Sequence, residues 1–482
     1  MTTGADAPAE PEAPGRAGRA LGWSFLNVAV GRFGTIAIGI ALARLLGPEE
    51  FGTYAVAFVA LMAILSFNEL GVSLAIVRWQ EDPAEIAPTV TTISLGMSAV
   101  LTVAAMVAAP WFTSAMGAPE ATGLVRLLSL CVLINGLVAT PAALMQRMFR
   151  QGQRMVVDQV NVWVGAVVSV VLAALGMGAL SLAVGRLAGA AVSAVLFLRY
   201  SPLPYRLGLD RRYVNGLLAF GLPLAGASVV VFLVGFLDQL IVGRLLGAVM
   251  LGYYVLATNL ASWPITLFSQ PMRSVAPALF ARLQHDALRT REAFGRVLRL
   301  LAGIALPACA AIAATAPDLV RFVYGAEWAP AGEVLHWLAM FAALRILFEL
   351  AYDYVVVLGR SNAILAVQIV GIFALAPALW VAVGWRGIDG AALAVVAVAV
   401  LVTGPMYVRL LRLSGIRLGS LVRALVVPLL GAVVCYALGL VVAAGVESPF
   451  LTLAAAGTAT LAVIAVLLWW HRGDLQTFRS PG

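Results

Sequence analysis

Three charged residues share one stripe of an expected membrane helix. Arg345, Glu349 and Asp353 stand at positions i, i+4 and i+8 of the apolar run 331–358, and a helix would place all three on one face. A charge at mid-membrane depth costs between about 2.5 and more than 10 kcal/mol. The stripe therefore either neutralises itself so that the helix can be inserted, or it lines a hydrophilic cavity in which Arg345 attracts an anion. The residues alone leave both interpretations open.

A second charged pair lies in the first two apolar runs. Arg32 falls about ten residues into a run long enough to cross a bilayer, and an arginine at that depth should face a watery cavity or a partner. Glu69, next to Asn68, is either the counterion of Arg32, a proton-titratable group, or half of a polar pair that reaches the nearby interface. The candidate substrate-binding residues are therefore Arg32, Arg345, Glu349, Asp353 and Glu69.

Residue types that commonly perform catalysis or bind metal are sparse. The three histidines form no cluster, and the three cysteines stand singly in apolar runs. All 31 basic residues are arginine, which excludes a phosphate-binding loop of the GxxxxGK type. We expect no catalytic residue, no metal and no cofactor, and the protein is not expected to be an enzyme.

Composition places the chain in a membrane. Its 482 residues are 62% hydrophobic and only 11% charged, with a mean hydropathy of +0.98, whereas soluble domains are about 25% charged. A net charge of +8 elsewhere suggests nucleic acid. Here most arginines lie in short loops, as membrane topology requires, so no nucleic acid partner is expected.

Fourteen apolar runs are bounded by charge, glycine or proline, which predicts an all-α polytopic protein with about 14 transmembrane helices. With the N-terminus inside, 23 arginines fall at inner loops and five at outer ends, so both termini are expected in the cytoplasm of a bacterium. The runs are 22–46, 52–77, 86–110, 122–145, 157–177, 179–199, 217–243, 252–270, 297–317, 331–358, 362–384, 388–408, 420–444 and 449–470.

The chain repeats itself after 200 residues. Residues 41–57 read ALARLLGPEEFGTYAVA and residues 241–257 read IVGRLLGAVMLGYYVLA, which align without a gap. A related pair of stretches, GAPE at 117–120 and GAE at 325–327, lies 208 residues apart, and each stretch precedes a long apolar segment. Duplicated bundles are common in transporters. Arg44 and Arg244, which match in the repeat and lie at helix ends, are expected to cap helix C-termini.

The repeat predicts two pseudo-symmetric six-helix lobes followed by two C-terminal helices. Alternating access in such proteins is largely a rocking of rigid lobes, so we expect the lobes to move about the linker. The predicted parts are a disordered cytoplasmic tail (1–20), an N-lobe (21–200), an inter-lobe cytoplasmic linker (201–216), a C-lobe (217–410), two further helices (411–470) and a cytoplasmic tail (471–482).

Three stretches carry a resemblance to a known family. ARLLGPEEFGTYAVA, NELGVSLAIVR and LVRFVYGAEWAPAGEVLHWLA resemble the polysaccharide-type flippases of the multidrug/oligosaccharidyl-lipid/polysaccharide exporter superfamily. This resemblance implies a secondary transporter that moves polyprenyl-diphosphate-linked oligosaccharide from the inner to the outer leaflet for surface polysaccharide biosynthesis. It also implies a V-shaped central cavity whose basic residues meet the diphosphate, and Arg32 and Arg345 are positioned as such residues would be.

The partners expected from this resemblance are the lipid-linked oligosaccharide, membrane lipids, H+ or Na+ as a coupling ion, and the polymerase and glycosyltransferases of the same pathway. Three alternatives stay open. The first is a cation-coupled multidrug antiporter of the same superfamily, although a cation pathway should be dominated by buried carboxylates. The second is a flippase for a lipid-linked peptidoglycan precursor. The third is a polysaccharide polymerase or glycosyltransferase, which usually carries large outer loops that this chain lacks.

Overall fold

The computed structural model describes residues 14–68, 72–79, 82–283 and 286–471. The regular secondary structure in these ranges is helical, as the apolar runs predicted. The α-helices are α1 (Pro14–Asn68), α2 (Val72–Arg78), α3 (Pro83–Ala115), α4 (Thr122–Arg147), α5 (Gln151–Ala174), α6 (Ala179–Arg199), α7 (Arg211–Pro264), α8 (Gln270–Leu283), α9 (Ala287–Ala314), α10 (Ala316–Tyr324), α11 (Ala329–Val357), α12 (Ser361–Val398), α13 (Gly404–Leu413), α14 (Leu418–Gly445) and α15 (Pro449–Trp470). Short 3-10 turns lie at η1 (Pro119–Ala121) and η3 (Ala326–Trp328), and π-helical segments at η2 (Ile265–Ser269) and η4 (Ala399–Thr403).

Three of the long helices each contain two membrane crossings joined by a sharp kink. The described residues hold eleven segments long and apolar enough to cross a membrane, and α1, α7 and α12 turn back at Gly47, Gly247 and Gly387. The φ angles of these glycines are 67°, 81° and 60°, a region that side chains disfavour and glycine adopts freely. Dividing the three helices at their kinks is consistent with the prediction of about 14 spans, and the chain is a multi-pass membrane protein.

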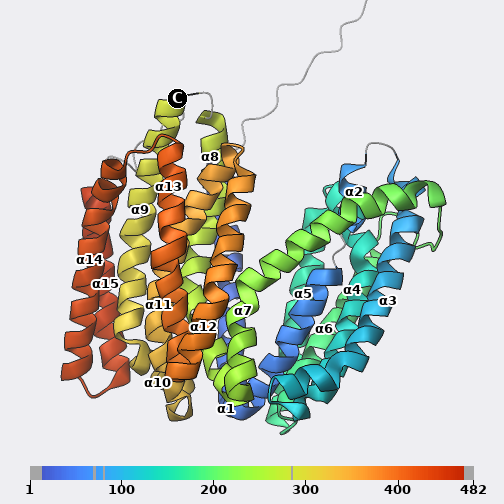
Figure 1. The fold of residues 1–482 in the computed structure, drawn as a ribbon, viewed down its shortest axis with the longest axis horizontal. Helices are drawn as coiled ribbons and strands as arrows, with labels where there is room; N and C mark the ends of the chain where they lie inside the picture. Colours follow the sequence, from blue (N-terminus) through green and yellow to red (C-terminus); the bar gives the residue numbers. More distant parts are fainter. Residues whose placement is uncertain (1–13, 69–71, 80–81, 284–285, 472–482) are drawn as a thin grey trace, which may run out of the picture.

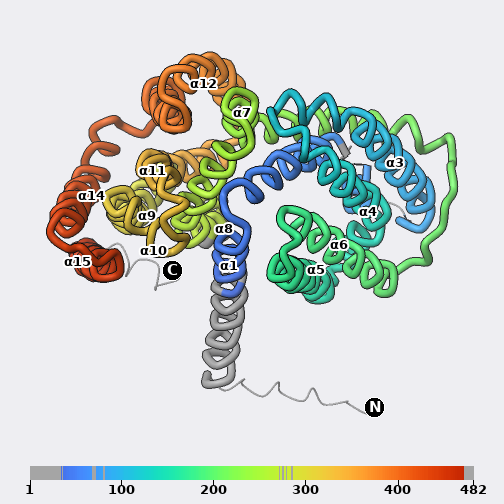
Figure 2. The backbone as a smooth tube through the Cα atoms, turned by 90° about the horizontal axis from the view of Figure 1, so that it is seen from below, coloured from blue at the N-terminus to red at the C-terminus, as the bar shows by residue number. Residues whose placement is uncertain are grey.

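The helices form two lobes that lie side by side (Figure 1, Figure 2). The N-lobe comprises α1–α6, and the C-lobe comprises most of α7 and the helices up to α13, with α14 and α15 packed against α9. We call the end that holds α10 and the kinks at Gly47 and Gly247 the kinked end, and the end that holds α2 and residues 201–210 the linker end. In Figure 1 the lobes meet through α1 and α7 towards the kinked end and diverge towards the linker end.

One apolar cluster joins the lobes towards the kinked end. It combines Val56 and Met116 of the N-lobe with Val242 and Leu335 of the C-lobe, all of them buried. Aromatic rings also cross the boundary, since the ring of Phe51 meets the Trp328 ring edge to face with centroids 5.5 Å apart. Burial of apolar area contributes about 25 cal/mol per Å², so this cluster stabilises the contact between the lobes.

The linker between the lobes is bonded to the N-lobe. The hydroxyl of Thr92 on α3 donates to the carbonyl of Gly208 (2.8 Å), and the Gly208 amide donates back to the same hydroxyl (3.0 Å). The first turns of α7 also pack on this lobe, because Leu217 belongs to the apolar cluster of Ile76 and Val90. The passage from one lobe to the other therefore lies inside α7.

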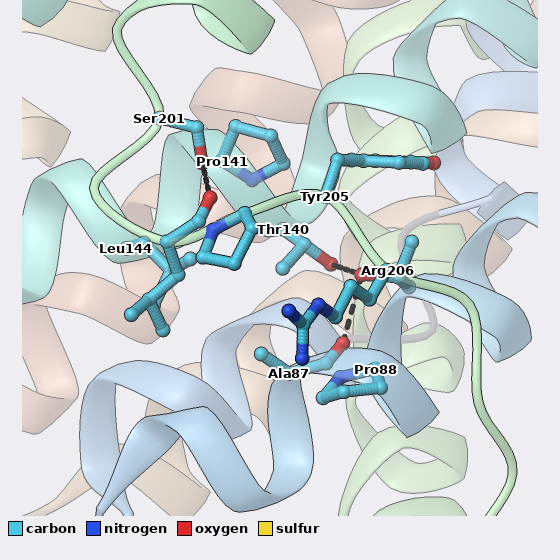
Figure 3. A pocket seen from close by; sticks show the side chains of 11 residues that line it. Ala87, Pro88, Thr140, Pro141, Leu144, Ser201, Tyr205 and Arg206 are labelled. Carbon is cyan, nitrogen blue, oxygen red and sulfur yellow. Dashed lines mark hydrogen bonds between the residues drawn. The ribbon is translucent and has the colours of Figure 1, made fainter.

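A small pocket lies where the linker covers α3 and α4 (Figure 3). The hydroxyl of Thr91 donates to that of Thr140 across it (2.9 Å). The buried hydroxyl of Tyr205 makes no hydrogen bond with any residue that the structure describes. This pocket is confined to the linker end of the N-lobe and does not touch the charged stripe on α11.

Candidate functional site

The charged stripe on α11 forms as its spacing predicted. Nε of Arg345 lies 3.2 Å from Oε1 of Glu349, one turn further along the same helix. The second carboxylate oxygen of Glu349 accepts a hydrogen bond from the hydroxyl of Ser269, the last residue of η2. Glu349, whose side chain is 17% exposed, therefore has a positive partner on its own helix and a neutral donor on another.

Asp353 pairs with an arginine that the sequence did not single out. Nε and Nη2 of Arg273 on α8 each lie 3.2 Å from one carboxylate oxygen of Asp353, which is a forked, two-bond contact. The Asp353 side chain is only 8% exposed, against 42% for Arg273. The guanidinium carbon of Arg273 also lies 5.7 Å from the centroid of the Tyr352 ring, an arrangement that favours the cation.

The two cross-helix contacts have the same sequence offset. Ser269 meets Glu349 and Arg273 meets Asp353, and each pair is separated by 80 residues. A constant offset means that the two helices run parallel at this point, with one side chain of each pair per helical turn. The spacing of Ser269 and Arg273 matches that of the two carboxylates and was the available sequence signal, but the predicted span 252–270 ends before Arg273.

Arg345 keeps hydrogen-bond donors that its contact with Glu349 does not use. Its side chain is 50% exposed, and the contact with Glu349 uses only Nε. The two terminal nitrogens make no hydrogen bond within the described part of the chain, although Asp238 on α7 lies within electrostatic reach of the guanidinium. Asp238 itself accepts from the hydroxyl of Tyr254 (2.8 Å) and from the amide of Gln239 (2.8 Å). The guanidinium fork of Arg345 is thus free to meet phosphate oxygens, for which its geometry is suited.

The other two candidates cannot be joined to this site. Glu69 lies outside the described residues, and so does the side chain of Arg32. The structure therefore brings together Arg345, Glu349 and Asp353 and adds Ser269 and Arg273. Among the described residues no group of three histidine, cysteine or acidic side chains is arranged to hold a metal ion.

Sequence comparisons place the chain among proteins of polysaccharide biosynthesis. A family model described as "Polysaccharide biosynthesis protein" matches residues 41–333, which is more than half of the chain. The succinoglycan biosynthesis transport protein ExoT of Rhizobium meliloti (strain 1021) is 29% identical over 67% of this chain and 65% of its own length. The lipopolysaccharide biosynthesis protein WzxC of Escherichia coli (strain K12) is 26% identical over 63% of this chain and 62% of its own. The match thus spans slightly less than two thirds of each of these relatives.

Structural comparisons agree with the two-lobed helical fold. The inward closed conformation of the lipid II flippase MurJ superposes with a TM-score of 0.76 over 93% of this chain and 100% of that one, at 12% identity. An inward-facing multidrug resistance transporter of the MATE family and MOP superfamily gives a TM-score of 0.61 over 79% of this chain and 96% of that one, at 16% identity. At these identities the likeness concerns the fold alone.

Proposed function

The chain belongs to the family of polysaccharide biosynthesis proteins, and on that premise we propose that it is a flippase for lipid-linked oligosaccharide. It would move a polyprenyl-diphosphate-linked oligosaccharide from the inner to the outer leaflet of a bacterial cytoplasmic membrane by alternating access of its two lobes. The names of the relatives support a role in building a surface polysaccharide. The two-lobed fold supports alternating access.

The observation that carries the proposal is the half-exposed Arg345 in the middle of a membrane helix. A mid-membrane arginine is expensive unless it faces water or a charged partner, and Glu349 occupies only one of its nitrogens. A diphosphate offers several acceptor oxygens to the remaining fork. Arg345 would therefore bind the diphosphate, while Glu349 holds the guanidinium in place.

The proposed orientation puts the linker end in the cytoplasm. It rests on the arginine asymmetry, because 23 arginines fall at the loops expected inside and five at the opposite ends. The lobes diverge towards the linker end in Figure 1, so a substrate from the cytoplasmic leaflet would enter there. Both termini would then be cytoplasmic, and the pathway's glycosyltransferases and polymerase would act before and after transport.

The coupling ion is the remaining part of the proposal. Secondary transport needs an ion gradient, and H+ or Na+ would have to bind a carboxylate within the lobes. Among the described residues Glu349 and Asp353 are bonded to Ser269 and Arg273. An ion that binds either carboxylate would loosen these bonds between η2–α8 and α11.

Transport by the purified protein tests the proposal. Proteoliposomes would be loaded with a polyprenyl-diphosphate oligosaccharide carrying a fluorescent sugar, and an impermeant quencher would report movement between leaflets under an imposed H+ or Na+ gradient. The proposal expects gradient-dependent movement that is absent from liposomes without protein. Movement of lipid II alone would favour the peptidoglycan-precursor alternative, and export of a cationic dye alone would favour the antiporter.

A further inference from the structure

Arg44 joins the N-lobe to the C-lobe at the kinked end. It lies on α1 three residues before the kink at Gly47. Its Nε donates to the carbonyl oxygen of Val323 (2.7 Å) and its Nη2 to that of Phe322 (2.6 Å). Both carbonyls belong to the last turn of α10 in the opposite lobe, where the helix dipole places partial negative charge.

Arg244 makes the corresponding contact in the opposite direction. It lies on α7 three residues before the kink at Gly247, and its Nη1 donates to the carbonyl oxygen of Ala115 (2.7 Å). Ala115 is the last residue of α3 in the N-lobe. The expectation that these arginines cap helix C-termini was therefore right, but each caps a helix of the opposite lobe.

The two acceptors are equivalent positions of the repeat. Val323 precedes Gly325 by two residues, and Ala115 precedes Gly117 by two residues. These glycines open the GAE and GAPE stretches that recur in the two lobes. Interchanging the two lobes therefore turns the Arg44 contact into the Arg244 contact. The two contacts are related by a pseudo-two-fold axis.

A third pair of repeat positions lies close to that axis. A Cβ added to Gly52 would come within 2.2 Å of the carbonyl oxygen of Ala248, and one added to Gly252 within 2.8 Å of that of Pro48. The Cβ added to Gly252 would also lie 3.0 Å from the Cα of Gly52. The backbones of α1 and α7 therefore touch where the repeat-related glycines meet, and the two arginines flank this contact.

We propose that Arg44 and Arg244 are a paired latch that holds the kinked end closed, and that both must release for the lobes to part there. Every bond of the latch crosses the lobe boundary, so separation of the lobes at this end breaks all three bonds. This inference rests on the proposed function, because only a transporter needs the kinked end to open. The latch then favours the state open to the linker end, in which the lipid-linked substrate enters.

Distance measurements between spin labels test the latch without any substrate. The three cysteines would be replaced by alanine, and nitroxides placed on cysteines at Glu120 and Glu447 would report the kinked end. A second pair at Phe149 and Leu413 would report the linker end. The variants are Arg44→Ala, Arg244→Ala and both together, measured in nanodiscs by double electron–electron resonance.

Each single substitution should raise the ratio of open to closed molecules at the kinked end by about threefold to tenfold, because a hydrogen bond from a charged group is lost at an exposed site. The double variant should show the product of the two effects, with a longer distance at the kinked end and a shorter one at the linker end. Arg44→Ala should raise the open-to-closed ratio more than Arg244→Ala, because Arg44 makes two bonds and Arg244 makes one. A local packing defect would not couple the two ends in this way.

Arg126→Ala is the matched control. Nε of Arg126 on α4 donates to the carbonyl of Met106 on α3 (3.2 Å), so it makes the same kind of bond within one lobe. Distances in this variant should equal those of the parent. If the alanine double variant does not give monodisperse protein, the double methionine variant decides by the same criterion, since methionine is a long, flexible side chain without an N–H donor.

The proposal is overturned if the double variant has the distance distributions of the parent, or if Arg126→Ala changes them equally. These outcomes are separate from the fate of the proposed function. Failure to move any lipid-linked oligosaccharide would refute the transport proposal, whereas the distances are measured in the absence of substrate and report only on the latch.

Discussion

Replacing Arg345 tests whether this residue binds the substrate or only neutralises the charge of Glu349. Arg345→Ala removes the Nε bond to Glu349. It also removes the two terminal nitrogens, which make no hydrogen bond within the described residues. Hydrogen bonds to charged groups contribute about 1.5–3 kcal/mol, and the half-exposed side chain places Arg345 at the lower end. A loss of about 1.5 kcal/mol corresponds to roughly tenfold weaker binding of the diphosphate.

The structure limits the damage that this substitution does to folding. Glu349 keeps the hydroxyl of Ser269 as a donor after Arg345 is removed, so its carboxylate is not left without a partner. We therefore expect nearly unchanged protein levels in the membrane. Export should fall in the order Arg345, Arg345→Lys, Arg345→Ala, Arg345→Glu, because lysine keeps the charge but loses the fork and glutamate repels the diphosphate.

The assay is complementation of a flippase-deficient strain, with surface polysaccharide measured against the amount of protein in the membrane. Arg212→Ala is the control, since Arg212 is an exposed arginine paired with Asp210 at the linker end. The reasoning is refuted if Arg345→Ala combined with Glu349→Gln restores full export. Arg345 would then serve only to neutralise Glu349, and the diphosphate would have to bind elsewhere.

Three further predictions concern stability, packing and topology. Arg273→Ala leaves the buried carboxylate of Asp353 without its forked partner and should lower the free energy of unfolding by about 3 kcal/mol, and adding Asp353→Asn should recover most of it in thermal unfolding; no recovery would contradict the pairing. Gly52→Ala should lower the melting temperature because its Cβ meets a backbone carbonyl oxygen of the other lobe at 2.2 Å, whereas Gly39→Ala, with nothing within 4 Å, should not; equal effects would argue against close contact of the lobes. A cysteine at Glu327 in a cysteine-free chain should react with an impermeant thiol reagent in intact cells, and labelling only after the cells are permeabilised would invert the proposed orientation.

The sequence predicted those features whose cause is local. About 14 spans follow from apolar runs of sufficient length, and the kinks at Gly47 and Gly247 fall between spans that the sequence separated. The stripe on α11 follows from a spacing of four residues, because helical periodicity needs no knowledge of neighbouring helices.

Contacts between distant segments were not predictable in the same way. Arg273 appeared to follow a span and was assigned to a loop, but α8 continues from η2 and carries it alongside α11. Likewise the position of Arg44 at a helix end indicated a cap, whereas the choice of α10 as the capped helix depends on how the two lobes meet. Apolar helices of similar composition give no local signal of which neighbour they will contact.

The π-helical turn at η2 sets the orientation of the side chains on α8, which follows it directly. A π turn holds one residue more than an α turn, and each residue of an α-helix rotates the next side chain by about 100°. Deleting one residue between 265 and 268 would let the segment rewind as α-helix with Arg273 still facing Asp353, whereas deleting one residue within 270–272 would rotate Arg273 by about 100° away from it. In alignments of related chains, a one-residue gap at 265–268 should therefore leave the acidic residue on α11 in place, whereas a one-residue gap at 270–272 should accompany a change of that residue.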